Sequence, residues 1–398
     1  MPSTILYGTP GSLYTGKVRS YLRKQRIDFE ERSAGDPRFR AQVVPVVGRW
    51  IIPVLQTPDG EFVQDGADII DHFESRGLAR VSAYPTTPRH LAVSRLFELF
   101  GGEGLLRPAM HYRWNFDATN LAFLTDDFCA GLAAPGSSAE EKAAVFARSS
   151  GAMRKATSAF GVTADTVPLV EASYLDFLAR LDAHLALAPY LLGGHPTIGD
   201  YGLIAPLYAH LGRDPYPALL MKQRAPHVWR WVERMNAPEQ GAGEYADTRE
   251  GLFADDALPE SLLALLRFVA EDYLPELQAH VATTNQWLAE RPQIVAGHNG
   301  QEKPGARAIG MAVFAWRGAQ IRSMVMPYRL YLLQRLQDAC AAMDATDRAR
   351  VRDVFTDAGL APVLDLTTLR RVERQRHLEV WGPAPAGHNP GRQTDAAP

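Results

Sequence analysis

Apolar and polar positions in the first 80 residues follow the periods of short strands and helices. The pattern predicts strands at 4–7 and 27–31, with a helix between them at 14–25. The stretch 50–74 then predicts two strands, joined by a turn at 58–60, and the start of a helix. Strands and helices of this length in alternation predict a small α/β sheet covered by helices.

Helical spacing of apolar residues replaces this alternation after a proline-containing linker at 82–88. Within this block, Thr197 and Asp200 match a capping box, because a threonine at the N-cap is followed three residues later by an acidic side chain. A glycine-containing boundary at 241–244 precedes a second helical tract. Its apolar stripes are Leu262, Leu266, Val269 and Tyr273 and, after Pro327, Tyr328, Leu332, Leu336, Cys340 and Met343.

These patterns divide the chain into four parts. We predict an α/β domain at 1–82, an all-helical domain at 89–240, a mostly helical extension at 245–381 and a flexible tail at 382–398, which is rich in Pro, Gly and Ala. The charged run 370–376 contains an acidic residue, and we interpret it as a solvated helix face.

Charge and composition indicate which partners, locations and metal sites to expect. A net charge of −3 gives no electrostatic reason to expect nucleic acid or an anionic membrane as partner. No apolar run approaches the ~20 residues of a membrane span, and no signal peptide is recognised. Cys129 and Cys340 are far apart, which excludes a CxxC pair and suits a cytoplasmic location. The histidines are scattered, so no metal site is predicted.

Pro53 lies inside an apolar run that would otherwise form a central strand. Proline has no N–H for the ladder, so we expect a cis Ile52–Pro53 bond at the start of a strand; the alternative is a trans proline at an edge. Gln64, Asp65 and Gly66 follow the next strand and precede a helix. An acidic side chain and free backbone N–H groups at a helix N-terminus predict a cradle for a small zwitterion.

Taken together, these segments resemble the glutathione S-transferase family over roughly residues 1 to 240. The matching segments are 6–14 with 17–19, 52–55, 64–66 with 69–70, and 197–203. The resemblance implies a thioredoxin-like N-terminal domain followed by an all-α glutathione-transferase-like domain, with the mostly helical extension in addition. It also implies that glutathione lies along the first domain, that a small hydrophobic electrophile enters the cleft between the domains, and that the chain pairs as a homodimer.

The resemblance also assigns a catalytic position. In serine- and cysteine-type members, the group facing the glutathione sulfur lies in the loop before the first helix, and Ser12, two residues before Tyr14, matches that place. A hydroxyl that donates to the thiolate lowers the thiol pKa from its usual ~8.5. A serine here also serves as an ordinary helix N-cap. Tyr7 is the alternative donor, because tyrosine-type members place a phenol near the end of the first strand; a buried strand tyrosine is the other interpretation.

By the same resemblance, Ile52 beside Pro53 offers backbone groups to the cysteinyl part of glutathione, and Gln64, Asp65 and Gly66 hold its γ-glutamyl end. Gly66 departs from the family pattern, which has a serine there. The missing hydroxyl costs about 0.5–1.5 kcal/mol, up to about tenfold in affinity. Asp65 is also suited to cap the following helix, and both roles hold together.

The run 110–114 brings aromatic residues and a cation to the start of the helical domain. We predict that His111, Tyr112 and Trp114, with Tyr14, line the hydrophobic substrate site. Packing in the core is the alternative for each of them.

These assignments predict a glutathione-dependent transferase, with a role in detoxification, whose thiolate attacks a hydrophobic electrophile. The alternative is a binding or scaffold protein of the same fold with little or no transfer, which Gly66 and the extension favour. Reduction through a protein cysteine is disfavoured, because Ser12 occupies the cysteine place. The extension covers the cleft, replaces the dimer surface or adds one; its sequence carries no chemical motif that decides between these.

Overall fold

The first domain is a four-stranded mixed sheet with helices on both faces. The computed structural model describes residues 3–239, 243–245 and 251–384. The strand order is β2-β1-β3-β4; β2 is parallel to β1, β3 is antiparallel to β1, and β4 is antiparallel to β3. The elements are β1 (Thr4–Gly8), α1 (Leu13–Lys24), β2 (Phe29–Ser33), the π-helical η1 (Phe39–Val43), α2 (Val44–Val47), β3 (Val54–Gln56), β4 (Phe62–Gln64) and α3 (Gly66–Ser75). The predicted β-α-β and β-β-α units are confirmed.

Successive side chains of the sheet face two different cores, because the side chains of a strand alternate between its faces. Leu6 and Leu55 are paired across β1 and β3 and lie in the main apolar core with α1 and α3. Tyr7 and Val54, the next pair, lie in a smaller cluster with Phe39 on the opposite face. Tyr7 is therefore turned away from α1.

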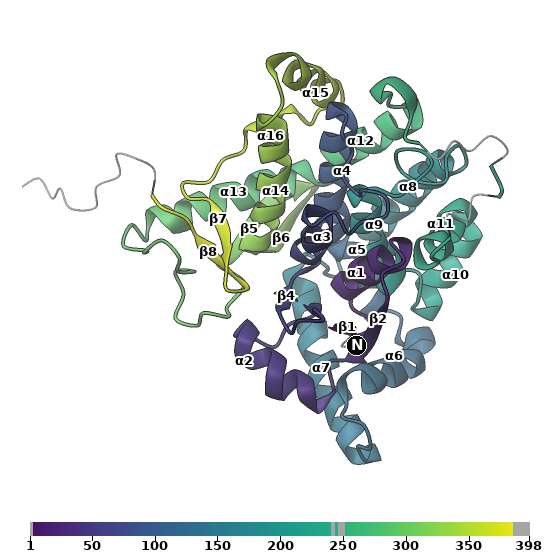
Figure 1. Ribbon diagram of the computed structural model, residues 1–398, viewed down its shortest axis with the longest axis vertical. Helices are drawn as coiled ribbons and strands as arrows, with labels where there is room; N and C mark the ends of the chain where they lie inside the picture. The colour runs from purple at the N-terminus through teal and green to yellow at the C-terminus, as the bar shows by residue number, and fades with distance from the viewer. Residues whose placement is uncertain (1–2, 240–242, 246–250, 385–398) are drawn as a thin grey trace, which may run out of the picture.

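The second domain is a helical bundle built around α9 (Figure 1). The helices are α4 (Pro88–Leu99), η2 (Phe100–Gly104, π-helical), α5 (Leu106–Trp114), α6 (Asp117–Leu132), α7 (Ala139–Ala159), α8 (Val167–Leu185), α9 (Ile198–Ala209), α10 (Pro215–Arg224) and α11 (Pro226–Asn236). The helix α9 packs against both α1 and α4. A Cβ on Gly202 would lie 2.5 Å from the Cα of Glu98, so only glycine permits this approach. The predicted capping box of Thr197 and Asp200 is confirmed.

The extension combines helices with two β-hairpins. Its elements are η3 (Ala254–Asp256), α12 (Glu260–Asp272), α13 (Leu274–Ala289), β5 (Gly310–Trp316), β6 (Ala319–Val325), α14 (Pro327–Ala341), α15 (Ala345–Asp357), α16 (Ala361–Asp365), β7 (Val372–Gln375) and β8 (Leu378–Trp381). The apolar stripes predicted for 262–273 and 328–343 correspond to α12 and α14. Residues 385–398, which include most of the predicted flexible tail, lie outside the described residues.

The interpretation of 370–376 as a solvated helix face is wrong. Val372–Gln375 is the strand β7, and Arg371 at its start pairs with Asp338 of α14. The side chain of Arg374 is buried against the first domain instead of reaching solvent. A charged run that contains a single apolar residue, Val372, gives no period from which a strand can be recognised.

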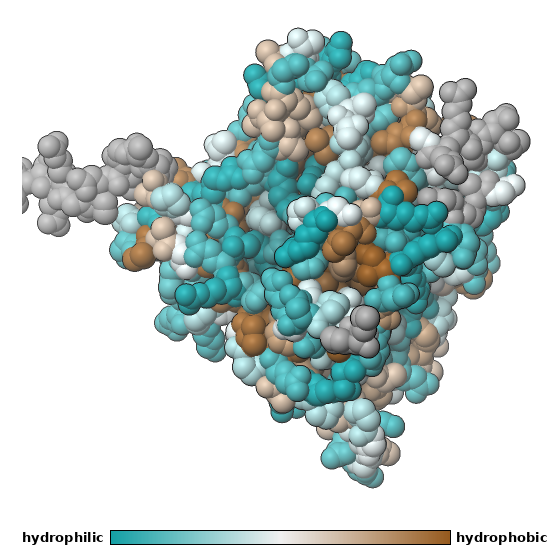
Figure 2. Space-filling view, in the orientation of Figure 1, coloured by the Kyte–Doolittle hydropathy of each residue, from teal (hydrophilic) through white to brown (hydrophobic). Residues whose placement is uncertain are grey.

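The extension lies along the first two domains on the side of α3 and α4 (Figure 1). From α14, the Tyr331 hydroxyl donates to Asp68 of α3 at 3.0 Å, and Arg335 pairs with Asp71 at 2.6 Å. Hydrophilic residues predominate on the face in view, with apolar patches between them (Figure 2). No helix in the described part of the chain is long and apolar enough to cross a membrane.

Candidate functional site

Ser12 stands at the N-terminus of α1, where it acts as the N-cap. Its Oγ accepts a hydrogen bond from the Thr15 N–H at 3.3 Å, and the side chain is partly exposed. A serine hydroxyl has one proton and two lone pairs, so accepting from the helix leaves the O–H free to donate elsewhere. The capping role is thus compatible with a hydrogen bond to a ligand.

The loop that carries Ser12 is held from two sides. Arg113 of α5 donates to the Gly11 carbonyl at 2.9 Å and is itself fixed by Asp214 at 2.7 Å. Arg19 of α1 donates to the Thr9 carbonyl at 3.2 Å. In the sequence, Arg113 is recognisable only as one cation in an aromatic run, because its partners lie about 100 residues away in the chain.

The expected cis Ile52–Pro53 bond is confirmed. It directly precedes β3, whose first residue, Val54, pairs with Tyr7 at the end of β1. The Pro53 carbonyl accepts from the Asp65 N–H at 3.5 Å. Pro53 therefore lies between the end of β1 and the turn that carries Asp65.

Asp65 is the N-cap of α3 and has a φ of 98°, a region that non-glycine residues occupy at a cost of about 1–3 kcal/mol. Its Oδ1 accepts from the Ala67 N–H at 2.7 Å and from the Tyr328 hydroxyl of α14 at 2.9 Å. Arg374 of β7 donates to the carbonyl and to the side-chain oxygen of Gln64 at 3.0 and 2.7 Å. Asp65 is only 6% exposed and Gln64 2%, so the extension covers the turn predicted to hold a γ-glutamyl group.

Gly66 packs against the start of α1. A Cβ built there would lie 3.3 Å from Cδ of Lys17 and 3.7 Å from the carbonyl oxygen of Tyr14. The start of α3 and the first turn of α1 are therefore in contact, and the segments carrying Ser12, Pro53 and Asp65 meet at one end of the paired strands β1 and β3.

Tyr14 and Tyr7 occupy very different places. The Tyr14 hydroxyl donates to Oε1 of Glu103 at 2.8 Å, and burial raises the pKa of Tyr14 well above its usual value. The hydroxyl of Tyr14 therefore joins a polar network. The Tyr7 hydroxyl donates to Gln56 at 3.3 Å inside the cluster with Phe39, on the sheet face opposite α1.

His111, Tyr112 and Trp114 are core residues in this structure, with 1%, 2% and 4% of their surface exposed. His111 is hydrogen-bonded to Glu171 at 3.0 Å, and Tyr112 stacks on Phe116. As placed, none of the three presents a surface to a substrate.

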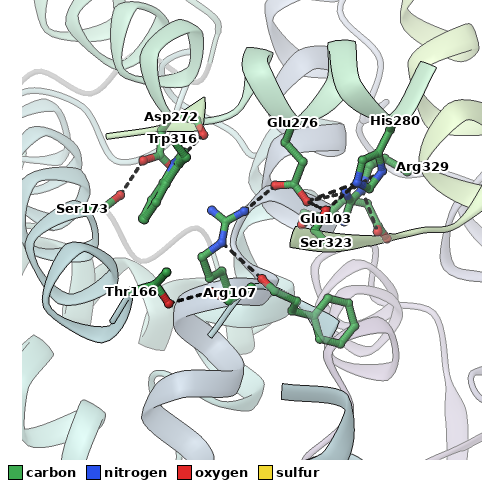
Figure 3. Close-up of polar contacts among 12 residues, drawn as sticks. Glu103, Arg107, Thr166, Ser173, Asp272, Glu276, His280, Trp316, Ser323 and Arg329 are labelled. Atoms are coloured by element: carbon green, nitrogen blue, oxygen red, sulfur yellow. Dashed lines mark hydrogen bonds and ion pairs between the residues drawn. The ribbon is translucent and has the colours of Figure 1, made fainter. Parts of the chain in front are cut away.

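A buried network of charged residues fixes the extension to the helical domain (Figure 3). Glu276 of α13 lies between Arg107 of α5 and Arg329 of α14, 2.7 Å from each. Nε of Arg329 is also 3.6 Å from Oε2 of Glu103, the residue that accepts from Tyr14. The network thus runs from the extension to a residue two positions from Ser12. None of these partners was recognisable in the sequence, because they are separated by tens to hundreds of residues.

His280 completes the network in its neutral form. Its Nδ1 lies 3.0 Å from Nη1 of Arg329, which can only donate, so Nδ1 is the acceptor and Nε2 carries the proton. Nε2 donates to Oγ of Ser323 at 2.5 Å, and Ser323 donates to Glu276 at 2.7 Å. Burial and the nearby charge of Arg329 lower the pKa of His280 to about 3.

We predict that this histidine makes the protein less stable in acid. A histidine in the unfolded chain has a pKa of about 6.5, so below that pH the unfolded chain binds a proton that folded His280 excludes. The free energy of unfolding therefore decreases as the pH is lowered, and at pH 4.5 it is about 3 kcal/mol smaller than at neutral pH. His184, whose pKa burial lowers to about 4, adds in the same direction. Urea unfolding at pH 7.5 and 4.5 measures the effect. His280→Gln should show a weaker pH dependence; equal dependence in both proteins contradicts the assignment.

In the described ranges, no group of three or more His, Cys, Asp or Glu side chains is placed to hold a metal ion.

Two family models match the chain in the order of its first two domains. The glutathione S-transferase N-terminal domain matches residues 6–77, and the glutathione S-transferase C-terminal domain matches residues 162–234. Residues 6–77 and 162–234 are thus similar to the two domains of glutathione S-transferases. The extension lies outside both matched segments, so the two models do not describe it.

Several solved structures are similar to this chain. The β-etherase LigF from Sphingobium sp. strain SYK-6 is 18% identical, with a TM-score of 0.40 over 61% of this chain and 98% of its own. A glutathione S-transferase from Methylobacterium radiotolerans, in complex with glutathione sulfonate, is 19% identical, with a TM-score of 0.36 over 63% and 100%. GSTFuA3 from Phanerochaete chrysosporium is 17% identical, with a TM-score of 0.41 over 60% and 97%. No curated protein matches the chain.

Proposed function

We propose that this protein is a glutathione-dependent transferase in which Ser12 stabilises the glutathione thiolate as it attacks a small hydrophobic electrophile. The observation that carries the proposal is the geometry of Ser12. Its oxygen is anchored by the Thr15 N–H, which leaves the hydroxyl proton available to a thiolate at the N-terminus of α1. The partial positive charge of a helix N-terminus favours an anion at the same place.

The neighbouring segments support a peptide beside Ser12. Ile52 is partly exposed next to the cis proline, in position to offer its backbone to a cysteinyl group. Asp65 is held in a backbone conformation unfavourable for a non-glycine residue, and such conformations concentrate at functional sites. The position of Tyr7 in the opposite core favours Ser12 over Tyr7 as the donor to sulfur.

A second candidate is a binding or scaffold protein with little or no transfer. The observation that favours it is the contact of Tyr328 and Arg374 with Asp65 and Gln64, which buries the turn expected to hold the γ-glutamyl group. In this case the extension would occupy the turn instead of the peptide.

Isothermal titration with glutathione tests the proposal. We expect saturable binding with a Kd below about 1 mM, equivalent to about 4 kcal/mol of binding free energy. The absence of binding at millimolar glutathione would contradict the transferase. Binding without conjugation of any electrophile from a panel of aryl halides, epoxides and enones would favour the binding protein.

Reduction through a protein cysteine finds no support. Burial raises the pKa of the Cys340 thiol to about 11, which leaves little of the reactive thiolate at neutral pH. A homodimer, a cytoplasmic location, a role in detoxification and a hydrophobic site formed by Tyr14, His111, Tyr112 and Trp114 stay predictions.

A further inference from the structure

Arg307 has no partner among the described residues, whereas two arginines of the same region are paired. It lies in the loop between α13 and β5, outside both segments matched by the family models. Nearby, Arg49 is paired with Glu379 at 2.7 Å, and Arg374 with Asp68 at 2.8 Å. Arg307, in contrast, makes no hydrogen bond or ion pair with any residue that the structure describes.

This loop runs along the first domain. A Cβ on Gly305 would lie 3.3 Å from Cβ of Arg49, which directly precedes the segment with the cis proline. Two residues further on, the side chain of Arg307 is exposed, although protein groups surround it closely enough for burial to oppose its charge. A side chain that is enclosed and yet accessible borders space that a ligand can enter.

The groups around Arg307 are those of the candidate site. The acidic groups that offset burial and raise its pKa are Tyr14, Glu379, Glu103 and Asp65. Three of these groups already have partners. Glu379 is paired with Arg49 and Arg374. Tyr14 donates to Glu103, which also lies beside Arg329.

Asp65 has a free oxygen. Its Oδ1 accepts both hydrogen bonds, from Ala67 and Tyr328, whereas Oδ2 has no hydrogen-bond partner in the described part of the chain. No ion pair joins Asp65 to Arg307. The site therefore contains one carboxylate oxygen and one guanidinium that lie near each other but do not contact each other. Two opposite charges held apart in this way complement a ligand group that carries both an ammonium and a carboxylate.

We propose that Arg307 binds the α-carboxylate of the γ-glutamyl end of glutathione, while Oδ2 of Asp65 accepts from its ammonium group. This inference rests on the proposed function, because glutathione is the ligand. It gives the extension a role in recognition: a guanidinium from the third part of the chain replaces the hydroxyl that Gly66 lacks. A charge-assisted, bidentate contact is stronger than the hydrogen bond of a serine.

The test compares Arg307→Gln with the wild type by isothermal titration, using two ligands. One is glutathione, and the other is 4-aminobutyryl-cysteinylglycine, which lacks only the α-carboxylate. We expect Arg307→Gln to bind glutathione roughly 10- to 100-fold more weakly, and to bind the analogue as the wild type does. The matched control is Arg322→Gln on β6, an exposed arginine whose side chain has no hydrogen-bond or ion-pair partner among the described residues. This variant should bind both ligands as the wild type does.

Three results would overturn the inference. Unchanged glutathione affinity in Arg307→Gln would remove Arg307 from the site and leave the proposed function intact. Equal losses for glutathione and the analogue would show that Arg307 does not contact the α-carboxylate. If the wild type binds neither ligand, the proposed function fails, and this inference fails with it.

Discussion

Replacing Ser12 by alanine is expected to lower kcat/KM for glutathione conjugation by roughly 100- to 1000-fold, the usual loss when one hydrogen-bond donor to a developing or bound anion is removed. The serine oxygen is already held by the Thr15 N–H, which leaves its proton free to donate at the start of α1. Glutathione affinity should change little, because the peptide is held elsewhere. Steady-state kinetics with a saturating electrophile measure the effect.

Two controls separate catalysis from capping. Ser12→Ala also removes a helix cap, at a cost of about 1 kcal/mol in stability. Ser138 caps α7 in the same way, with Oγ accepting from the Glu141 N–H at 3.2 Å, so Ser138→Ala should lose similar stability and keep full activity. Ser12→Thr retains the hydroxyl and the cap and should keep most of the activity. Full activity in Ser12→Ala would reject Ser12 as the donor.

Glu276→Gln is expected to reduce the free energy of unfolding by about 3–5 kcal/mol, because it leaves two buried guanidiniums without their shared counter-charge. Arg107 and Arg329 are 3% and 1% exposed, and each lies 2.7 Å from Glu276. This network joins the extension to the helical domain, so its loss should also loosen the extension. Urea unfolding at pH 7.5 measures the stability.

Glu260→Gln is the matched control for this variant. Glu260 pairs with Arg267 at 2.6 Å, but both side chains are largely exposed. An exposed pair of this kind contributes at most about 1 kcal/mol. A loss in Glu276→Gln no larger than the loss in Glu260→Gln would contradict the view that the buried network fixes the extension.

The parts of the fold that were predictable from sequence depend on local chemistry. Pro53 within an apolar run predicted a cis peptide bond, and Thr197 with Asp200 predicted the start of a helix. Both features are confirmed. The hairpin of β5 and β6 was missed because both faces of β5 are apolar. Phe314 is buried, but Val313 is 60% exposed, so no alternation marks the strand. The turn at Arg317-Gly318, where both residues have positive φ, was the signal that could have revealed it.

Only those residues of the candidate site that lie within recognisable segments of the sequence could be predicted. Ser12 and Asp65 lie within segments whose order in the chain suggested their places. Tyr328 lies 263 residues from Asp65 in sequence. The apolar stripe that contains Tyr328 predicts a helix but does not indicate which part of the first domain that helix will cover. Arg307 lies in a polar loop without a motif. Contacts of such long range depend on packing of the whole molecule, which composition and periodicity do not encode.

The most direct test of the central claim, that Ser12 stabilises a bound thiolate, is a pH titration of thiolate absorbance in glutathione bound to the wild type and to Ser12→Ala. We predict a thiol pKa clearly below the ordinary value of about 8.5 in the wild type, returning towards that value in the variant. An identical pKa in the two proteins, with glutathione bound to both, would contradict it.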